Sequence, residues 1–174
     1  MTPLSYALLG LIRMEPRSGY ALRKVFETTP LGNYSSSPGS IYPALKTLEK
    51  VGMIDSRPST ARKTQFHITP AGSQVLDSWL AQPVAPGENT DVSLLRFALL
   101  QAHPDRSLTL NFLRSFALAA RNHIVGLKAF MAGNLHQSMP LQSRLAVQYG
   151  LRATETAAEW AADAYKQLSE EINR

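Results

Sequence analysis

The stretch of sequence that decides the fold is Ser37-Pro38-Gly39-Ser40-Ile41-Tyr42-Pro43-Ala44-Leu45-Lys46-Thr47-Leu48-Glu49-Lys50-Val51-Gly52-Met53-Ile54. It predicts a short helix with Pro38 in its first turn and a glycine stop, followed directly by a strand. Ile41, Leu45 and Leu48 form an apolar stripe, whereas the outward residues are small, hydroxylated or basic. A helix of this kind can lie in the major groove of DNA while its apolar side packs on a core.

Two further helices are predicted before this stretch. Apolar residues at helical spacing indicate one helix from about Leu4 to Met14, which residues 15–17 break. Ser18 suits an N-cap, so a second helix should begin there and stop before Pro30. Residues 31–37 read as a polar turn. Two helices, a turn and an outward-facing third helix are the order of a helix-turn-helix.

Two short strands follow the third helix, at residues 53–57 and 64–68, and a fourth helix is expected from Thr69 through Leu80. The hairpin tip carries Arg62 and Lys63, which could reach DNA phosphates or simply form a solvated turn. Gly39 and Ser40 place backbone N–H groups at a helix start, where an anion can bind. The first half is therefore predicted to be a winged helix-turn-helix with a two-stranded β-hairpin wing.

The second half reads as helices only. Residues 83–90 are rich in proline and lack periodicity, so they predict a linker between domains 1–82 and 91–174. Helical patterns begin at Asp91 or Ser93, continue around residues 112–130, and end with a long helix over about 141–172. The fold class is thus mainly α, with an all-α C-terminal domain.

The last helix carries a stripe of small and apolar residues that predicts a dimer seam. Its members are Tyr149, Ala153, Ala157, Trp160, Ala161, Ala164, Leu168 and Ile172. A single helix of this length cannot bury such a face in so small a domain, so a homodimer is expected. Two-fold symmetry would match a palindromic operator in double-stranded DNA.

Several aromatic and arginine side chains are candidates for an effector pocket between the two halves. They are Trp79, Arg96, Phe97, Phe116, Arg121, Tyr149 and Trp160. Arg96 or Arg121 could receive a carboxylate, and an aromatic compound is one candidate ligand. The alternative is that the aromatics are core residues and the arginines surface residues.

Composition limits the function. The net charge is +5, and residues 1–85 hold nine Lys/Arg against five Asp/Glu, whereas residues 86–174 hold nine against eight. The basic first half indicates a polyanion partner. Without cysteine, disulfides and thiolate zinc sites are excluded. The four histidines show no metal-ligand spacing, and no phosphate loop or nucleophile motif occurs. We expect a cytoplasmic protein with no enzymatic activity, cofactor, metal or membrane span.

Five motifs resemble, in order and spacing, the PadR family of bacterial transcriptional regulators. They are Leu8-Leu9-Gly10-Leu11, Ser18-Gly19-Tyr20-Ala21-Leu22, Ser37-Pro38-Gly39-Ser40-Ile41-Tyr42-Pro43-Ala44-Leu45, Leu48-Glu49 and Ile68-Thr69-Pro70-Ala71-Gly72. The resemblance covers about residues 4–80, and the second half is similar in length and pattern to the family's helical C-terminal domain.

The resemblance implies a dimeric winged-helix repressor that a small molecule releases from DNA. Contacts from the third helix would come from Ser37, Ser40, Tyr42, Lys46 and Thr47, and wing contacts from Arg62, Lys63 and Thr64. The wing tip is shorter than in many relatives, so it is expected to contact phosphate rather than bases. The alternative function is a winged-helix protein-interaction module without DNA binding.

Overall fold

The computed structural model describes residues 1–29, 31, 38–58 and 64–172. The chain divides into two compact units, which are considered separately. The first unit comprises Met1–Ala81 and Leu94–His103, and the second comprises Gln82–Ser93 and the chain from Pro104 onward. Residues 94–103, which the sequence assigned to the C-terminal half, therefore pack with the N-terminal unit.

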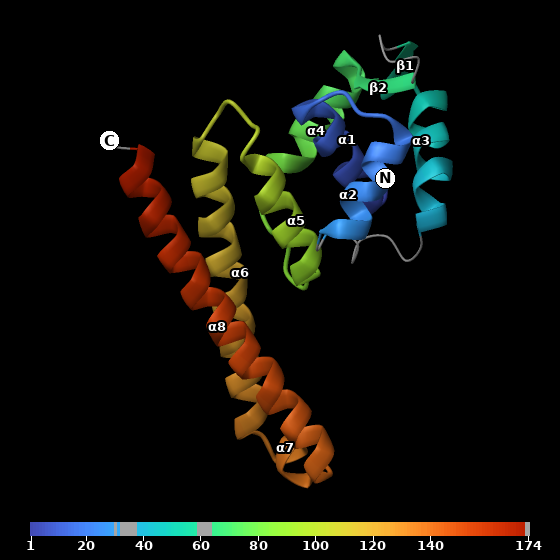
Figure 1. The fold of residues 1–174 in the computed structure, drawn as a ribbon. Helices are drawn as coiled ribbons and strands as arrows, with labels where there is room; N and C mark the ends of the chain where they lie inside the picture. Colours follow the sequence, from blue (N-terminus) through green and yellow to red (C-terminus); the bar gives the residue numbers. More distant parts are fainter. Residues whose placement is uncertain (30, 32–37, 59–63, 173–174) are drawn as a thin grey trace. The chain divides into compact units, whose positions relative to one another are not determined.

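The first unit contains α1 (Pro3–Met14), α2 (Gly19–Thr28), a 3₁₀ turn η2 (Pro38–Ser40), α3 (Ile41–Lys50), β1 (Ile54–Pro58), β2 (Thr64–Ile68), α4 (Pro70–Leu80) and most of α5 (Thr90–Leu100). In Figure 1 the three helices α1, α2 and α3 precede the hairpin, and α4 follows it. β1 and β2 are antiparallel, with Ile54 opposite Ile68 and Pro58 opposite Thr64. This is a winged helix-turn-helix, as predicted.

Helices α1, α2 and α4 of this unit begin where a side-chain oxygen can accept from a first-turn N–H group. Thr2 accepts from the Ser5 N–H, Ser18 from the Ala21 N–H, and Thr69 from the Gly72 N–H. Pro3 and Pro70 occupy the first turns of α1 and α4, where a missing N–H costs no hydrogen bond. The core lies between α1, α3 and α4, with Leu8, Ile12, Leu45 and Leu76 fully buried or nearly so.

Two predicted boundaries in this unit were wrong. The sequence placed Pro38 in the first turn of the third α-helix, but residues 38–40 form a separate 3₁₀ turn and α3 begins at Ile41. The reason is Pro43. In an α-helix begun at Pro38, Pro43 would be interior and would remove a backbone hydrogen bond, whereas in a helix begun at Ile41 it lies in the first turn. The strand predicted from Met53 likewise begins one residue later, because the Met53 N–H donates to Leu48 O at 2.9 Å.

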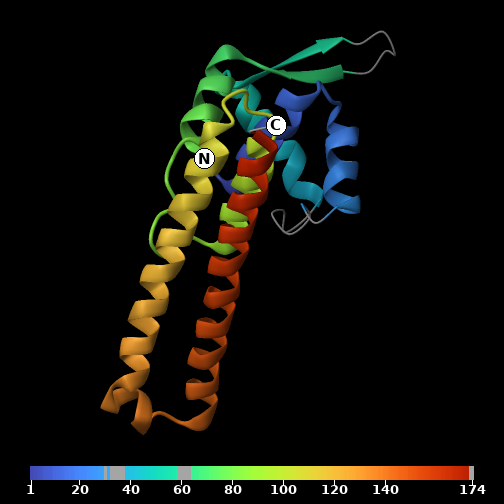
Figure 2. The ribbon, with the colours of Figure 1, turned by 90° about the vertical axis from the view of Figure 1, so that its left-hand side faces the viewer.

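The second unit is built on two long helices, α6 (Ser107–Ala132) and α8 (Leu141–Ile172), joined through the short α7 (Asn134–Ser138). They run antiparallel and side by side, as Figure 2 shows. The Phe116 ring meets the Trp160 ring edge-on at 5.5 Å between centroids, and the Lys128 ammonium lies 2.8 Å from Glu155. Ala161 is fully buried, which allows close approach of the two helices.

Candidate nucleic-acid interface

The recognition-helix candidate α3 has one buried and one exposed face. Ile41, Leu45 and Leu48 are at most 2% exposed and hold the helix to the core. On the other face, Tyr42 is 45% exposed and Lys46 and Thr47 are exposed. The structure thus separates the side chains that pack from those that a ligand could reach, in the division the sequence predicts.

Tyr42 is positioned by a glycine on the neighbouring helix. A Cβ atom at Gly19, the first residue of α2, would lie 2.8 Å from Cε1 of Tyr42. The phenol ring therefore lies against bare backbone, in a space that only glycine leaves open. One side of the Tyr42 ring is packed and the other is exposed, which suits an aromatic ring whose hydroxyl stays in contact with water. Gly19 is a supporting residue that stands in the motif Ser18-Gly19-Tyr20-Ala21-Leu22 and whose role the sequence alone did not indicate.

The hydroxyl of Thr47 is already engaged within α3, because it donates to Pro43 O at 2.9 Å. Its oxygen keeps lone pairs that can accept a further hydrogen bond. Ser40, at the junction of η2 and α3, has no side-chain capping bond to the helix and is half-buried. Gly39, beside it, is exposed.

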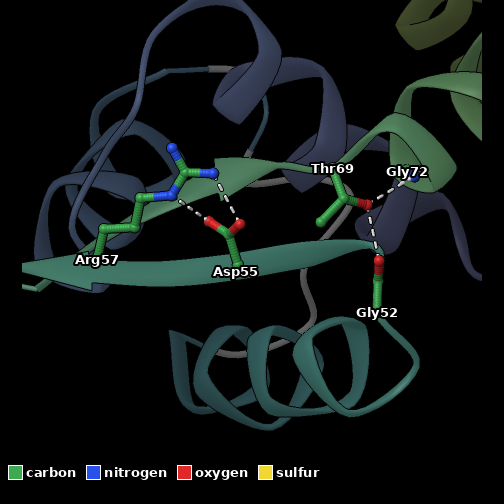
Figure 3. Close-up of polar contacts among 5 residues, drawn as sticks. All are labelled: Gly52, Asp55, Arg57, Thr69 and Gly72. Atoms are coloured by element: carbon green, nitrogen blue, oxygen red, sulfur yellow. Dashed lines mark hydrogen bonds and ion pairs between the residues drawn. The ribbon is translucent and has the colours of Figure 1, made fainter.

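The C-terminal end of α3 is held by a Schellman motif. Gly52 has φ +74°, its N–H donates to Glu49 O at 3.0 Å, and the Met53 N–H donates to Leu48 O at 2.9 Å. Gly52 O in turn accepts from the hydroxyl of Thr69 at 2.7 Å, and the same Thr69 oxygen accepts from the Gly72 N–H at 3.1 Å (Figure 3). One side chain thereby fastens the end of α3 to the start of α4.

Gly72 completes this junction. A Cβ atom there would lie 2.1 Å from the backbone oxygen of Met53, so no larger residue fits without moving the chain. Thr69 and Gly72 are further positioning residues, to which the sequence assigned no role beyond the start of the fourth helix. The threonine three residues before a glycine, directly after a strand, was the available signal, because threonine favours the N-cap position.

The α1–α2 connection adds a third strand-like segment to the wing. Arg17 forms an isolated antiparallel bridge with Phe66, and the Phe66 N–H donates to Arg17 O at 2.9 Å. The middle of β2 is therefore tied to the connection between α1 and α2.

Charge is distributed unevenly over the first unit. Four of its described arginines form ion pairs with carboxylates: Arg13 with Asp77, Arg17 with Glu15, Arg23 with Glu27, and Arg57 with Asp55. Lys46 and Lys50 on α3 are exposed and form no ion pair with the described residues. The two lysines of the outward helix are thus available to an external anion, as is the exposed Lys24 on α2.

Arg57 and Asp55 form a two-bond pair on β1, with Nε and Nη2 of Arg57 donating to the carboxylate at 2.9 and 2.8 Å (Figure 3). These hydrogen bonds hold the pKa of Asp55 below its ordinary value and raise the pKa of Arg57. Arg57 is therefore neutralised locally, although it lies on the wing.

Three predicted DNA-binding residues, Ser37, Arg62 and Lys63, lie outside the described residues. Thr64, the last predicted contact, begins β2 and is exposed.

The predicted effector residues are divided between the two units. Trp79 is buried in the first unit, where it stacks on Tyr6 at 4.1 Å, and the buried Arg96 guanidinium lies 5.8 Å from the Trp79 ring. Phe97, half-buried, belongs to the same unit.

In the second unit, Phe116 and Tyr149 line one cavity of about 500 Å³, and Trp160 packs on Phe116. Arg121 lines a different cavity of about 520 Å³. The predicted set therefore does not form one pocket within either unit.

The predicted dimer stripe is partly used within the chain. Ala161 is fully buried and Trp160 packs on Phe116 of α6. Ala157, Ala164 and Leu168 are half-buried, whereas Ala153 is exposed and Tyr149 is 76% exposed. The side chain of Ile172 lies outside the described residues.

Within the described parts of the chain, no cluster of three or more His, Asp or Glu side chains could hold a metal ion. The same residues include no helix that is both long and apolar enough to cross a bilayer.

The chain is similar to known regulators over its first half. Residues 8–78 match the family described as "Transcriptional regulator PadR-like family". The chain is 35% identical over 74 residues to "Transcriptional regulator YqjI" of Escherichia coli, covering 42% of this chain and 36% of that protein. It is 34% identical over 90 residues to "Negative transcriptional regulator PadR" of Bacillus subtilis, covering 48% of this chain and 50% of that protein.

The chain thus spans half or less of the length of these curated relatives. Among solved structures, Bacillus subtilis PadR in complex with operator DNA aligns with 95% of this chain and 98% of that chain, at 23% identity and a TM-score of 0.42. The motifs of α1 to α4 lie within the matched residues. Over residues 8–78, the chain is therefore similar to the PadR-like family of transcriptional regulators.

Proposed function

We propose that the protein is a homodimeric, sequence-specific DNA-binding repressor. The observation that carries this proposal is the outward face of α3, where Tyr42, Lys46 and Lys50 are exposed and the two lysines lack acidic partners among the described residues. The relative from Bacillus subtilis is named a negative regulator, which supports repression.

In this proposal, the N-terminal half of α3 faces base edges in the major groove. The Ser40 hydroxyl donates to or accepts from bases, and the Thr47 hydroxyl, whose proton is bonded to Pro43 O, accepts from them. The Tyr42 hydroxyl and the Lys46 ammonium contact phosphate. Ser37, Gly39, Thr64 and the wing cations Arg62 and Lys63 complete the proposed surface. A binding protein of this kind needs no catalytic residue, so we infer that it is not an enzyme.

Binding to the promoter DNA of its own gene tests the proposal. Fluorescence anisotropy should show preference for that DNA over a scrambled duplex, and the affinity should fall steeply between two salt concentrations because phosphate contacts release counterions. Lys46→Gln should weaken binding to both duplexes and lower the salt slope by about 1. Lys166→Gln, which changes an exposed lysine on α8, is the matched control and should leave both quantities unchanged.

Binding that ignores salt, or that makes no distinction between the duplexes, would contradict the proposal. In that case the surface around Tyr42 and Lys46 would serve a protein partner instead.

We further propose that residues 91–174 mediate the dimer. Exposed apolar side chains on α6 and α8 support this proposal, since large apolar residues left in water mark interaction surfaces. They are Leu118, Val125, Leu141, Leu145 and Tyr149. Two copies joined there would present two α3 helices to a palindromic operator.

A small molecule bound in the second unit is the proposed release signal, with two cavities of about 500 and 520 Å³ as candidate sites.

A further inference from the structure

The exposed face of α2 adjoins the exposed face of α3. The two helices pack against each other in the first unit (Figure 1), and the Tyr42 ring of α3 lies against the backbone of Gly19, the first residue of α2. Residues four apart on a helix are neighbours on its surface, so Arg23 and Glu27 continue from Gly19 in one row. The Tyr42 ring therefore lies at one end of a row of charged residues on α2.

A second row on α2 runs beside the first. It contains Tyr20, which is 66% exposed, and Lys24, which is exposed and forms no ion pair with the described residues. Leu22 and Phe26 are buried and hold the opposite side of α2 to the core. The two rows thus present hydroxyl and cationic groups to solvent.

Within the first row, Arg23 is held by Glu27. Its Nε donates to Oε1 of Glu27 at 2.6 Å, and the two side chains are 46% and 39% exposed. This hydrogen bond and the charge of Glu27 raise the pKa of Arg23, and the phenol groups of Tyr42 and Tyr20 act in the same direction. The Arg23 guanidinium therefore lies near both tyrosines. It has five N–H donors, and the bond to Glu27 uses one of them.

We propose that α2 adds a phosphate site to the DNA-binding surface, and that Glu27 competes with the phosphate for Arg23. In the free protein, Arg23 is paired with Glu27. On DNA, the guanidinium turns to a backbone phosphate that the hydroxyls of Tyr20 and Tyr42 also contact, with Lys24 beside it. The Glu27 carboxylate then stands without its partner next to a polyanion, so it lowers the affinity.

Phosphate suits this set of donors. A guanidinium binds phosphate oxygens through two parallel hydrogen bonds, and hydroxyl and ammonium groups add single ones. In a helix-turn-helix, the helix before the recognition helix crosses the DNA backbone, so α2 meets phosphates while α3 meets base edges. The inference rests on the proposed function, because it assigns further contacts to the same surface.

Fluorescence anisotropy with the promoter duplex and its scrambled counterpart tests the inference on the full-length protein. Arg23→Gln should weaken binding to both duplexes about three- to tenfold and lower the salt slope by about 1, because one phosphate contact is lost. Glu27→Gln should tighten binding to both duplexes about two- to tenfold, because Arg23 is then released without cost. The melting temperatures should match that of the wild type, since the pair is exposed.

Two variants in the second unit are the matched controls. Arg144→Gln and Glu159→Gln make the same charge changes at exposed positions of α8. Each should change the affinity by less than about twofold, because exposed charges beyond a Debye length from the DNA are screened. The controls separate a contact at α2 from an effect of net charge.

Tyr20→Phe provides an independent variant. It removes only the hydroxyl of an exposed ring, so the core is unchanged, and the affinity for both duplexes should fall about two- to tenfold. Tyr149→Phe, at another exposed tyrosine, is its control and should bind DNA as the wild type does.

The outcomes distinguish this inference from the proposed function. If the wild type prefers promoter DNA while Arg23→Gln and Glu27→Gln change the affinity in the same direction, or leave it unchanged, the phosphate site is wrong and the proposed function stands. A loss in Arg23→Gln that is confined to one duplex would assign Arg23 to bases and overturn the phosphate role. A wild type that does not distinguish the duplexes would overturn both.

Discussion

At the scale of single residues, the exposed face of α3 depends on the absence of a side chain at Gly19. The Tyr42 ring occupies the space that a Cβ atom at Gly19 would need, 2.8 Å from Cε1. Gly19→Ala should therefore displace the ring while favouring the helical conformation of α2. We expect DNA affinity to fall about two- to tenfold, the effect of one lost hydrogen bond, as measured by anisotropy.

Gly126→Ala is the matched control for this variant, because a Cβ atom at Gly126 in α6 meets nothing within 4 Å. It should raise the free energy of unfolding by about 0.5–1 kcal/mol and leave DNA binding unchanged. In a Tyr42→Ala background, Gly19→Ala should have no further effect on affinity. A further loss there would show that Gly19 acts by another route.

The pair of Asp55 and Arg57 makes a second prediction at this scale. Asp55→Asn removes the carboxylate that engages Arg57 on the wing strand, so the guanidinium becomes available to phosphate. DNA affinity should rise for all sequences, and the salt slope should increase by about 1. Glu159→Gln, which removes one carboxylate from an exposed position of α8, tests whether the loss of a negative charge alone changes affinity. A rise confined to one DNA sequence would show that Arg57 reads bases.

The same pair should be insensitive to pH in the usual range. Hydrogen bonds from Arg57 hold the pKa of Asp55 below its ordinary value of 3.8, so the ionised pair favours the folded state above that value. This contribution is lost only as the pH falls through the lowered pKa. Between pH 6 and about 8, DNA affinity of the Asp55→Asn variant relative to the wild type should therefore stay constant.

At the scale of elements, the placement of α3 rests on Thr69. Its hydroxyl joins Gly52 O to the Gly72 N–H, so Thr69→Val keeps the shape and removes both bonds. We expect a loss of about 1–2 kcal/mol in the free energy of unfolding, measured by urea denaturation. Thr154→Val, whose hydroxyl bonds only within α8 to Gly150 O, should cost much less. Equal losses of unfolding free energy in the two variants would show that Thr69 contributes no more than an ordinary hydroxyl within a helix.

The elements themselves were largely predictable from sequence, because their boundaries depend on local chemistry. Ser18, Thr69 and Gly52 stand where caps and stops were expected, and α8 has the predicted range. The start of α3 differs from the prediction because Pro43 would lie in the interior of a helix that began at Pro38, where it would remove a backbone hydrogen bond. The packing partners of individual side chains were harder to predict, because they are distant in the sequence. Periodicity identifies Trp79 as apolar, but only packing shows that it stacks on Tyr6 within the first unit.

At the scale of the whole molecule, the second unit leaves apolar surface that one copy of the chain does not cover. Leu145 is 53% exposed and Tyr149 76% exposed on α8, whereas Ala161 of the predicted seam is already buried. A charge at Ala161 would therefore disturb the packing of α6 on α8 instead of testing assembly. Leu145→Glu is the sharper variant, since it places a carboxylate in the proposed seam without entering the core.

We expect Leu145→Glu to sediment as a monomer at concentrations where the wild type is a dimer, with an unchanged circular dichroism spectrum. Gln142→Glu, at an exposed polar position one turn earlier in α8, is the control and should remain dimeric. The monomer should also lose most of its affinity for a palindromic operator, because one α3 then binds without the second. A Leu145→Glu variant that stays dimeric would place the seam elsewhere on the second unit, and a wild-type monomer would refute the dimer itself.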